Sequence, residues 1–229
     1  MAPQSKRHEG SSSKCRVFVV DDHPIVRQGL AQMINRESDL TVCGEAEEAA
    51  AALQAIGVEN PDILIVDISL VGPDGLDLVK NVRLRYPALP VLILSMHDES
   101  IYAERALRAG ANGYIMKHEA AQKVLLAVRQ ILNHEIYVSE RVANRILHHY
   151  ISGSSTGKQS PLADLSDREL EVFRLIGEGH STRTIAEQLH LSIKTVESYQ
   201  AHIKEKLSLK NGRELVQHAI QWVMNERVA

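Results

Sequence analysis

Five short apolar runs, each followed by a helical pattern, constrain the fold of this chain more than any other feature of its sequence. The runs are nearly continuous in Val, Ile and Leu, which is typical of parallel strands covered by helices on both faces. Strand–helix repeats of this kind favour an α/β fold with a doubly wound, five-stranded parallel sheet. We predict strands at 16–21, 41–46, 62–67, 91–95 and 113–116, and helices at 25–35, 49–57, 76–85, 101–109 and 121–132.

Two changes in composition divide the chain into parts. Residues 1–14 are polar and rich in Ser, and residues 151–160 (ISGSSTGKQS) have the Gly/Ser content of a flexible linker. Beyond that linker every apolar pattern is helical, and a further helix is expected at 139–150. We predict a flexible N-terminus at 1–14, an α/β domain at 15–135, a linker helix and flexible linker at 136–161, and an all-helical domain at 162–229.

The composition excludes several classes of protein. Hydrophobic residues make up 44% and charged residues 24% of the chain, as in ordinary globular proteins. No apolar run approaches the ~20 residues that span a bilayer, and the polar N-terminus lacks the apolar stretch of a secretory signal. We therefore expect a cytoplasmic protein without a membrane partner. In that compartment Cys15 and Cys43 are expected to be reduced, although a disulfide between them is conceivable.

Charged and hydroxyl side chains lie where the predicted strands end. The first strand is followed by the pair Asp21 and Asp22, the third by Asp67, and the fourth and fifth end at Ser95 and Lys117. Ligands of an open parallel sheet bind outside the carboxyl ends of its strands. If the strand order is 2-1-3-4-5, the first and third strands are neighbours, and their three carboxylates converge.

Three converging carboxylates need positive charge nearby, because each raises the pKa of the others. Lys117 and a hard divalent cation with oxygen ligands, such as Mg²⁺, can provide it. One carboxylate can then attack phosphorus and become an aspartyl phosphate. Asp67 is our candidate, since it is the single acid between the pair and the lysine. The alternative, that Asp21 and Asp22 only cap a helix and Asp67 is a loop acid, explains each residue singly but not their joint placement.

The helical part contains a helix-turn-helix pattern. Ser166 and Glu169 fit a capping box, Ser181 precedes a short helix, and Ser192 follows a tight turn at 190–192 and precedes a longer helix. The second helix of such a motif lies in the major groove of DNA. The chain's net charge of −3 argues against nucleic-acid binding by the whole molecule. From 194 to 213, however, five residues are basic and two are acidic, so phosphate contact is expected there.

The strand-end residues lie in motifs that resemble the receiver domain of two-component response regulators. The motifs are VVDDHP around Asp22, LIVDISL around Asp67, GPDG at 72–75, LSM around Ser95 and GYIMK ending at Lys117. The resemblance implies a flavodoxin-like, CheY-like fold. It also implies that Asp67 accepts a phosphoryl group from the phosphohistidine of a sensor histidine kinase or phosphotransfer protein.

The same resemblance assigns roles to the residues around Asp67. It implies Mg²⁺ ligation by Asp22 and Asp67, by the backbone carbonyl of Ser69 and, through water, by Asp21. Ser95 occupies the position of the hydroxyl that follows the phosphoryl group, and Tyr114 that of the aromatic switch residue. His118 replaces the proline that often follows the lysine. Ser69 and His97 flank the pocket, where His97 either tunes the lifetime of the phosphate or is a solvent-exposed loop residue.

The segment from Leu165 to Leu207 resembles the LuxR-type DNA-binding domain, which together with the receiver identifies the chain as similar to response regulators of the NarL/FixJ class. The implied contacts are to the DNA backbone from Lys194, Thr195 and Tyr199, and to base edges from Glu197, Ser198, Ala201 and His202. The local positive charge adds Lys204 and Lys206 as expected phosphate contacts. A glutamate among the base readers favours a cytosine amino group. The alternative for Glu197 is an ion pair one turn away on its own helix.

We therefore predict a transcription regulator in which phosphorylation of Asp67 controls dimerisation and promoter binding. Catalysis beyond Mg²⁺-dependent self-phosphorylation and self-dephosphorylation is not expected. A haloacid-dehalogenase-like phosphatase needs an acid two residues after its nucleophile, where this chain has Ser69. A flavodoxin-like electron carrier needs a Gly- and hydroxyl-rich phosphate loop where this chain has Asp21 and Asp22. A degenerate receiver that leaves DNA binding constitutive conflicts with the intact acidic set.

Overall fold

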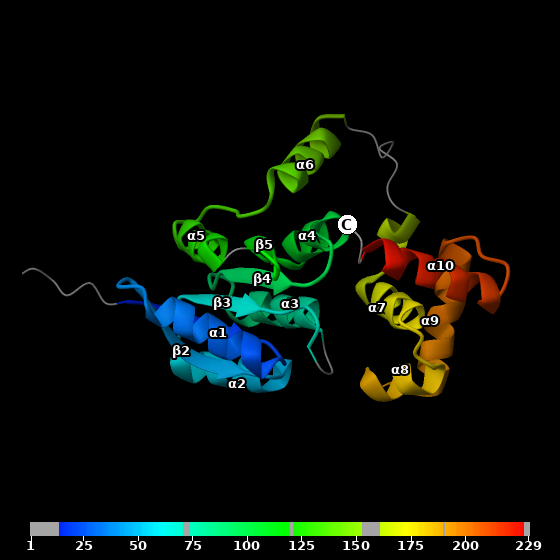
Figure 1. Ribbon diagram of the computed structural model, residues 1–229, viewed down its shortest axis with the longest axis horizontal. Coiled ribbons are helices and arrows are strands. Elements are labelled where there is room, and N and C mark those ends of the chain that lie inside the picture. The colour runs from blue at the N-terminus through cyan, green and yellow to red at the C-terminus, as the bar shows by residue number, and fades with distance from the viewer. Residues whose placement is uncertain (1–13, 71–73, 120, 153–160, 190, 227–229) are drawn as a thin grey trace, which may run out of the picture.

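The computed structural model describes residues 14–70, 74–119, 121–152, 161–189 and 191–226, and its elements alternate as the apolar runs predict (Figure 1). The strands are β1 (Cys15–Val20), β2 (Leu40–Ala46), β3 (Ile63–Val66), β4 (Val91–Ser95) and β5 (Gly113–Met116). The helices between and after them are α1 (Pro24–Asn35), α2 (Ala49–Glu59), α3 (Gly75–Arg85), α4 (Glu99–Ala109) and α5 (Ala121–Leu132). β1 and β3 each end one residue earlier than predicted, at Val20 and Val66.

The five strands form one parallel sheet in the order β2-β1-β3-β4-β5, which confirms the predicted doubly wound fold. The side chains of successive β1 residues lie on opposite faces of the sheet. Val17 and Val19 pack with residues of α1 and α5, whereas Phe18 and Val20 pack with residues of α2, α3 and α4. Both faces are therefore covered, which is why the strands are apolar throughout and only their ends carry polar chemistry.

A close backbone approach aligns the start of α3 with the end of β3. A Cβ atom at Gly75 would lie 2.0 Å from the carbonyl oxygen of Asp67, so only glycine fits there. Gly75 N also donates to Ile68 O at 2.8 Å. The β3–α3 turn is thus held tightly against the strand end. Gly72 and Pro73 of the GPDG motif lie outside the described residues.

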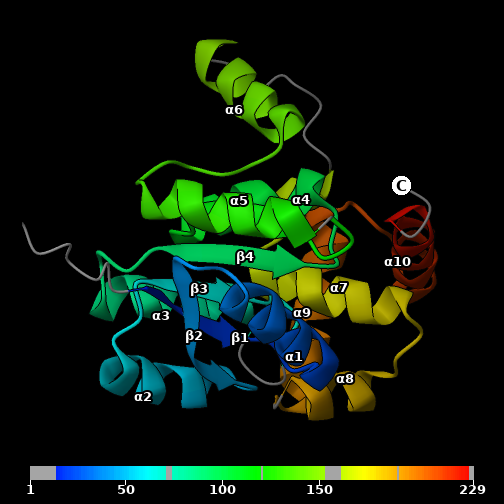
Figure 2. The ribbon, with the colours of Figure 1, turned by 60° about the vertical axis from the view of Figure 1, so that its left-hand side comes forward.

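The segment after α5 pairs with the edge of the sheet. Tyr114 N donates to Tyr137 O at 2.9 Å, and Tyr137 N donates to Asn112 O at 3.0 Å. The helix expected at 139–150 follows as α6 (Glu140–Ser152) and extends away from the sheet in both views (Figures 1 and 2). Ser139 donates to Glu99 of α4 at 2.8 Å. The flexible segments predicted at 1–14 and 151–160 lie almost wholly outside the described residues.

The C-terminal part is helical, as predicted. Its elements are the short η1 (Pro161–Asp164) and the helices α7 (Asp167–Gly177), α8 (Thr182–Gln188), α9 (Ile193–Lys206) and α10 (Gly212–Glu226). The capping box of Ser166 and Glu169 is present, and Ser181 and Ser192 cap α8 and α9. Phe173, Val196 and Ile203 lie in the buried core. Cys15 and Cys43 are free, so no disulfide joins them. Within the described residues, every helix is too short or too polar to cross a membrane.

Candidate functional site

The ends of three strands bring an acidic pocket together. Asp21 and Asp67 directly follow the neighbouring strands β1 and β3, and their backbone amides donate to Ala46 O at 3.1 Å and to Val20 O at 2.8 Å. Lys117 follows β5, and its Nζ lies 2.7 Å from Oδ2 of Asp21 and 2.7 Å from Oδ2 of Asp67. The two aspartates are 1% and 2% exposed. The predicted convergence of Asp21, Asp67 and Lys117 is therefore present.

The charges of this pocket depend on one another. Burial raises the pKa of Asp67, and the Lys117 ammonium opposes this rise without cancelling it. Burial also disfavours the charge of Lys117, but Asp67 and Asp21 outweigh it and raise the pKa of the amine. Lys117 is thus an ammonium at neutral pH, in place to offset negative charge on a group bound at Asp67.

The pocket has the donors of a cation site. One ligand atom each from Asp21, Asp22, His23 and Asp67 lies within 4.8 Å of the others. Oδ1 of Asp67 is buried and meets no hydrogen-bond donor among the described residues, so a cation would satisfy it. Carboxylate oxygens suit Mg²⁺. His23 was not predicted as a member of this cluster. It directly follows the acidic pair, and its Nδ1 lies 2.6 Å from Oδ1 of Asp22.

The two predicted switch residues bond to the same third residue. Ser95 is fully buried, and its Oγ accepts from His97 N at 3.2 Å. Tyr114 is 2% exposed, and its hydroxyl donates to His97 O at 2.8 Å. Ser69 lies in the turn after β3, and its Oγ is 2.8 Å from Nε2 of His97. Ligation of a metal by the Ser69 carbonyl stays a prediction. The peptide bond before His118 is trans.

His97 is therefore not a solvent-exposed loop residue, and that alternative was wrong. Its ring stacks on Tyr102 with the centroids 4.7 Å apart. Burial, with the positive charges of Arg174 and Lys117, lowers the pKa of His97 to about 3. The ring is consequently neutral and can both donate and accept. Because Arg174 comes from α7, no local pattern could have revealed this environment.

A second candidate surface lies on α9. Lys194, Glu197, Ser198 and His202 are exposed, and their spacing of three and four residues places them on one face of the helix. The Ser192 cap accepts from Thr195 N at 3.0 Å and so fixes the start of α9. This leaves polar groups and a helix N-terminus open to a partner.

The other predicted DNA contacts are placed differently. Tyr199 is partly buried against the core of the helical part, and Lys204 is half-buried. Lys206 lies with its Nζ 2.7 Å from Oε2 of Glu169 on α7. Oε1 of the same glutamate is 3.8 Å from Nδ1 of His202. The charge of Lys206 is thus paired within the protein, and α9 presents its open polar face through the first three of its turns.

Comparisons with known proteins match both parts of the chain. The family described as response regulator receiver domain matches residues 17–129, and the family described as bacterial regulatory proteins, luxR family, matches residues 163–219. The oxygen regulatory protein NreC of Staphylococcus epidermidis is 35% identical over 211 residues, which cover 90% of this chain and 97% of NreC.

Two solved structures extend the comparison to complexes. RcsB from Salmonella enterica serovar Typhimurium, bound to promoter rprA in the presence of the phosphomimetic BeF3−, has 27% identity and a TM-score of 0.64, covering 90% of this chain and 98% of RcsB. A structure of two RcsB dimers bound to two parallel DNAs has 27% identity and a TM-score of 0.55, covering 90% and 97%.

Proposed function

Because this chain belongs to the DNA-binding response regulators of the NarL/FixJ type, we propose that a histidine kinase or phosphotransfer protein phosphorylates Asp67 and that this controls dimerisation and promoter binding. The observation that carries the proposal is the buried Asp67 carboxylate, which is paired with Lys117 through one oxygen, while its other oxygen meets no donor in the described part of the chain. The proposal includes the division into a receiver at 15–135, a linker at 136–161 and a DNA-binding domain at 162–229.

The transfer step uses groups already held in place. A carboxylate oxygen of Asp67 attacks phosphorus as the P–N bond of the donor phosphohistidine breaks, and the released imidazole takes a proton from solvent. Lys117 offsets the charge on the phosphoryl oxygens. Mg²⁺, held by Asp22, Asp67 and the Ser69 carbonyl, with Asp21 acting through water, would supply further neutralisation there. No other catalysis is proposed beyond self-phosphorylation and self-dephosphorylation.

The consequences of phosphorylation follow from the buried switch residues. Ser95 would move toward the phosphoryl group, and Tyr114 would repack beside it, which biases the receiver between two arrangements. The RcsB complexes with promoter DNA and as DNA-bound dimers support a DNA-bound dimer for this chain. The exposed face of α9 would then enter the major groove, with Lys194 and Thr195 at the backbone and Glu197, Ser198 and His202 at the bases. We propose that the protein acts in the cytoplasm.

The test compares the full chain with Asp67→Asn. Each protein receives acetyl phosphate and Mg²⁺, and we expect wild type alone to gain the mass of one phosphoryl group, to increase in molar mass in solution and to bind a pool of random duplexes more tightly. Asp39→Asn, an exposed aspartate paired with Arg129, is the matched control and should behave as wild type. Equal phosphorylation and dimerisation of Asp67→Asn would overturn the proposal.

A further inference from the structure

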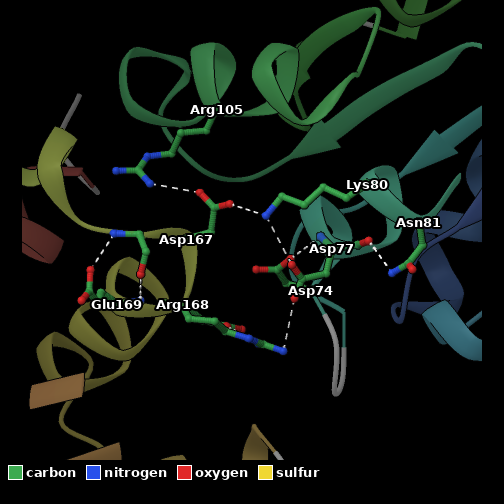
Figure 3. Close-up of polar contacts among 10 residues, drawn as sticks. Asp74, Asp77, Lys80, Asn81, Arg105, Asp167, Arg168 and Glu169 are labelled. Carbon is green, nitrogen blue, oxygen red and sulfur yellow. Dashed lines mark hydrogen bonds and ion pairs between the residues drawn. The ribbon is translucent and has the colours of Figure 1, made fainter. Parts of the chain in front are cut away.

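The receiver and the DNA-binding domain meet along α3, α4 and α7, and one aspartate joins all three (Figure 3). Oδ2 of Asp167, the first residue of α7, lies 2.7 Å from Nζ of Lys80 on α3. Its Oδ1 lies 3.0 Å from Nη1 of Arg105 on α4, and Nη2 of Arg105 donates to Leu162 O at 2.8 Å. Burial would raise the pKa of Asp167, but Lys80 and Arg105 hold it below its usual range.

This contact leaves the DNA-binding face open. Four polar residues of α9 stay exposed while the two domains are in contact: Lys194, Glu197, Ser198 and His202. Figure 1 shows α7 on the side of the helical domain that faces α3 and α4. Docking through α7 therefore does not act by covering α9. It fixes the orientation of one domain against the other.

A small pocket lies between the receiver and α7. Ser69 and His97 line it from the receiver, and Glu171 and Arg174 line it from α7. Ser69 and His97 lie two residues after Asp67 and Ser95 respectively. The surface on which α7 docks thus includes the two loops that carry the phosphoacceptor and its hydroxyl partner.

His97 lines this pocket together with Arg174 of α7. Its backbone bonds to both switch side chains, donating to Ser95 Oγ and accepting from the Tyr114 hydroxyl. Its ring bonds to Ser69 Oγ and lies close enough to Arg174 for that charge to lower its pKa. A movement of Ser95 or Tyr114 would therefore displace the backbone of His97, and with it the ring that lines the pocket beside α7.

We propose that His97 is a positioning residue that couples the phosphorylation pocket to the docking of α7 on α3 and α4, so that phosphorylation of Asp67 loosens the contact centred on Asp167. The inference rests on the proposed function, because it needs a phosphoryl group on Asp67. When the Ser95 hydroxyl shifts toward that group, its bond to the His97 amide lengthens, and the loop under α7 moves. The DNA-binding domain is then free to turn toward a second copy of the chain.

The ion pair of Lys80 and Asp167 gives a direct readout of docking. A carbodiimide joins an amine and a carboxylate that are in contact, and peptide mass spectrometry measures the yield. This cross-link is within one chain, so it reports docking independently of dimerisation. The ion pair of Lys123 and Glu119, which lies within the receiver, is the internal reference. The full chain is cross-linked with Mg²⁺, with and without BeF3−, and fluorine NMR monitors BeF3− bound at Asp67.

In wild type we expect BeF3− to lower the yield of the Lys80–Asp167 cross-link at least about threefold relative to the reference. In His97→Ala, which keeps the backbone bonds but lacks the ring, BeF3− should bind and leave the yield unchanged. His97→Gln restores a group that can reach Ser69 and should restore the fall, and it serves as the second variant if His97→Ala does not fold.

The two hypotheses fail differently. If BeF3− does not bind wild type at Asp67, the proposed function is overturned together with the inference. If BeF3− binds but the wild-type cross-link persists, or if the yield falls in His97→Ala as in wild type, only the inference is overturned.

Discussion

The acidic pocket and the exposed face of α9 both carry charge, but they treat it in opposite ways. In the pocket, Asp21 and Asp67 are buried and share Lys117, so the protein itself supplies the counterion. On α9, Lys194 and Glu197 are exposed, and we propose DNA as their partner. The difference teaches that a charge change should cost folding stability in the pocket and binding affinity on α9.

The largest expected effect is the loss of the buried amine. Lys117→Met leaves two buried carboxylates facing each other and should lower the free energy of unfolding by about 3 kcal/mol in metal-free buffer, with partial recovery in Mg²⁺. Urea unfolding measures the loss. Lys194→Met on α9 is the matched substitution and should change stability by less than about 0.5 kcal/mol. Equal losses in the two variants would remove the distinction between the regions.

The reverse should hold for DNA binding. Lys194→Ala should weaken binding to random duplexes about tenfold near 0.1 M salt and make the salt dependence shallower by about one phosphate contact. Fluorescence anisotropy across a salt series provides both quantities. Lys123→Ala, an exposed lysine on α5, should leave them unchanged. If the slope for Lys194→Ala matched that of wild type, α9 would not contact phosphate through this residue.

A buried acid at the domain interface sharpens the comparison, because it lacks the pocket's compensating amine. Burial, then Glu171 and Asp77, raise the pKa of Asp74 to about 7, and Arg168 only partly opposes them. A raised folded-state pKa makes the stabilising contribution complete near pH 4 and progressively lost toward pH 7.

Asp74→Asn keeps the cap on α3 but cannot ionise. The melting temperature of Asp74→Asn minus that of wild type should therefore rise by about 2–4 °C from pH 5 to pH 8. This rise corresponds to about 1 kcal/mol. Differential scanning calorimetry at the two pH values measures the gap. Asp164→Asn, an exposed residue of η1, should show no such gain. A constant difference between Asp74→Asn and wild type would refute the assignment.

The smallest effect concerns the helix caps. Ser192→Ala and Ser181→Ala each remove a hydroxyl that accepts a hydrogen bond from a backbone amide. Each should cost about 1 kcal/mol of stability or less. Only Ser192→Ala should also weaken DNA binding, because Ser192 fixes the N-terminal turn of α9 that carries Lys194 and Thr195. If both variants bound DNA equally well, the start of α9 would not need its cap to meet DNA.

Much of the pocket could be predicted because its residues follow a rule of topology. An apolar run defines a strand, and a parallel sheet gathers the residues that follow each run at one edge. The predicted strand ends were wrong by one residue: β1 and β3 end at Val20 and Val66. The aspartates that follow them still bond to the neighbouring strands through their backbone amides. His23 was not predicted because an exposed side chain leaves no periodic pattern in the sequence. The metal ligands and DNA contacts inferred from family resemblance stay predictions.

The amino-acid sequence by itself determined the alternation of strands and helices, the acids at the strand ends and the serine caps of the C-terminal helices. Each of these depends on a spacing of a few residues or on the order of strands in one sheet. Three features could not be read from the sequence: Asp167 meets Lys80, 87 residues away, His97 and Arg174 line the same pocket, and Lys206 pairs with Glu169. These features bring together segments whose relative placement depends on shape and charge over whole surfaces, which no local pattern encodes.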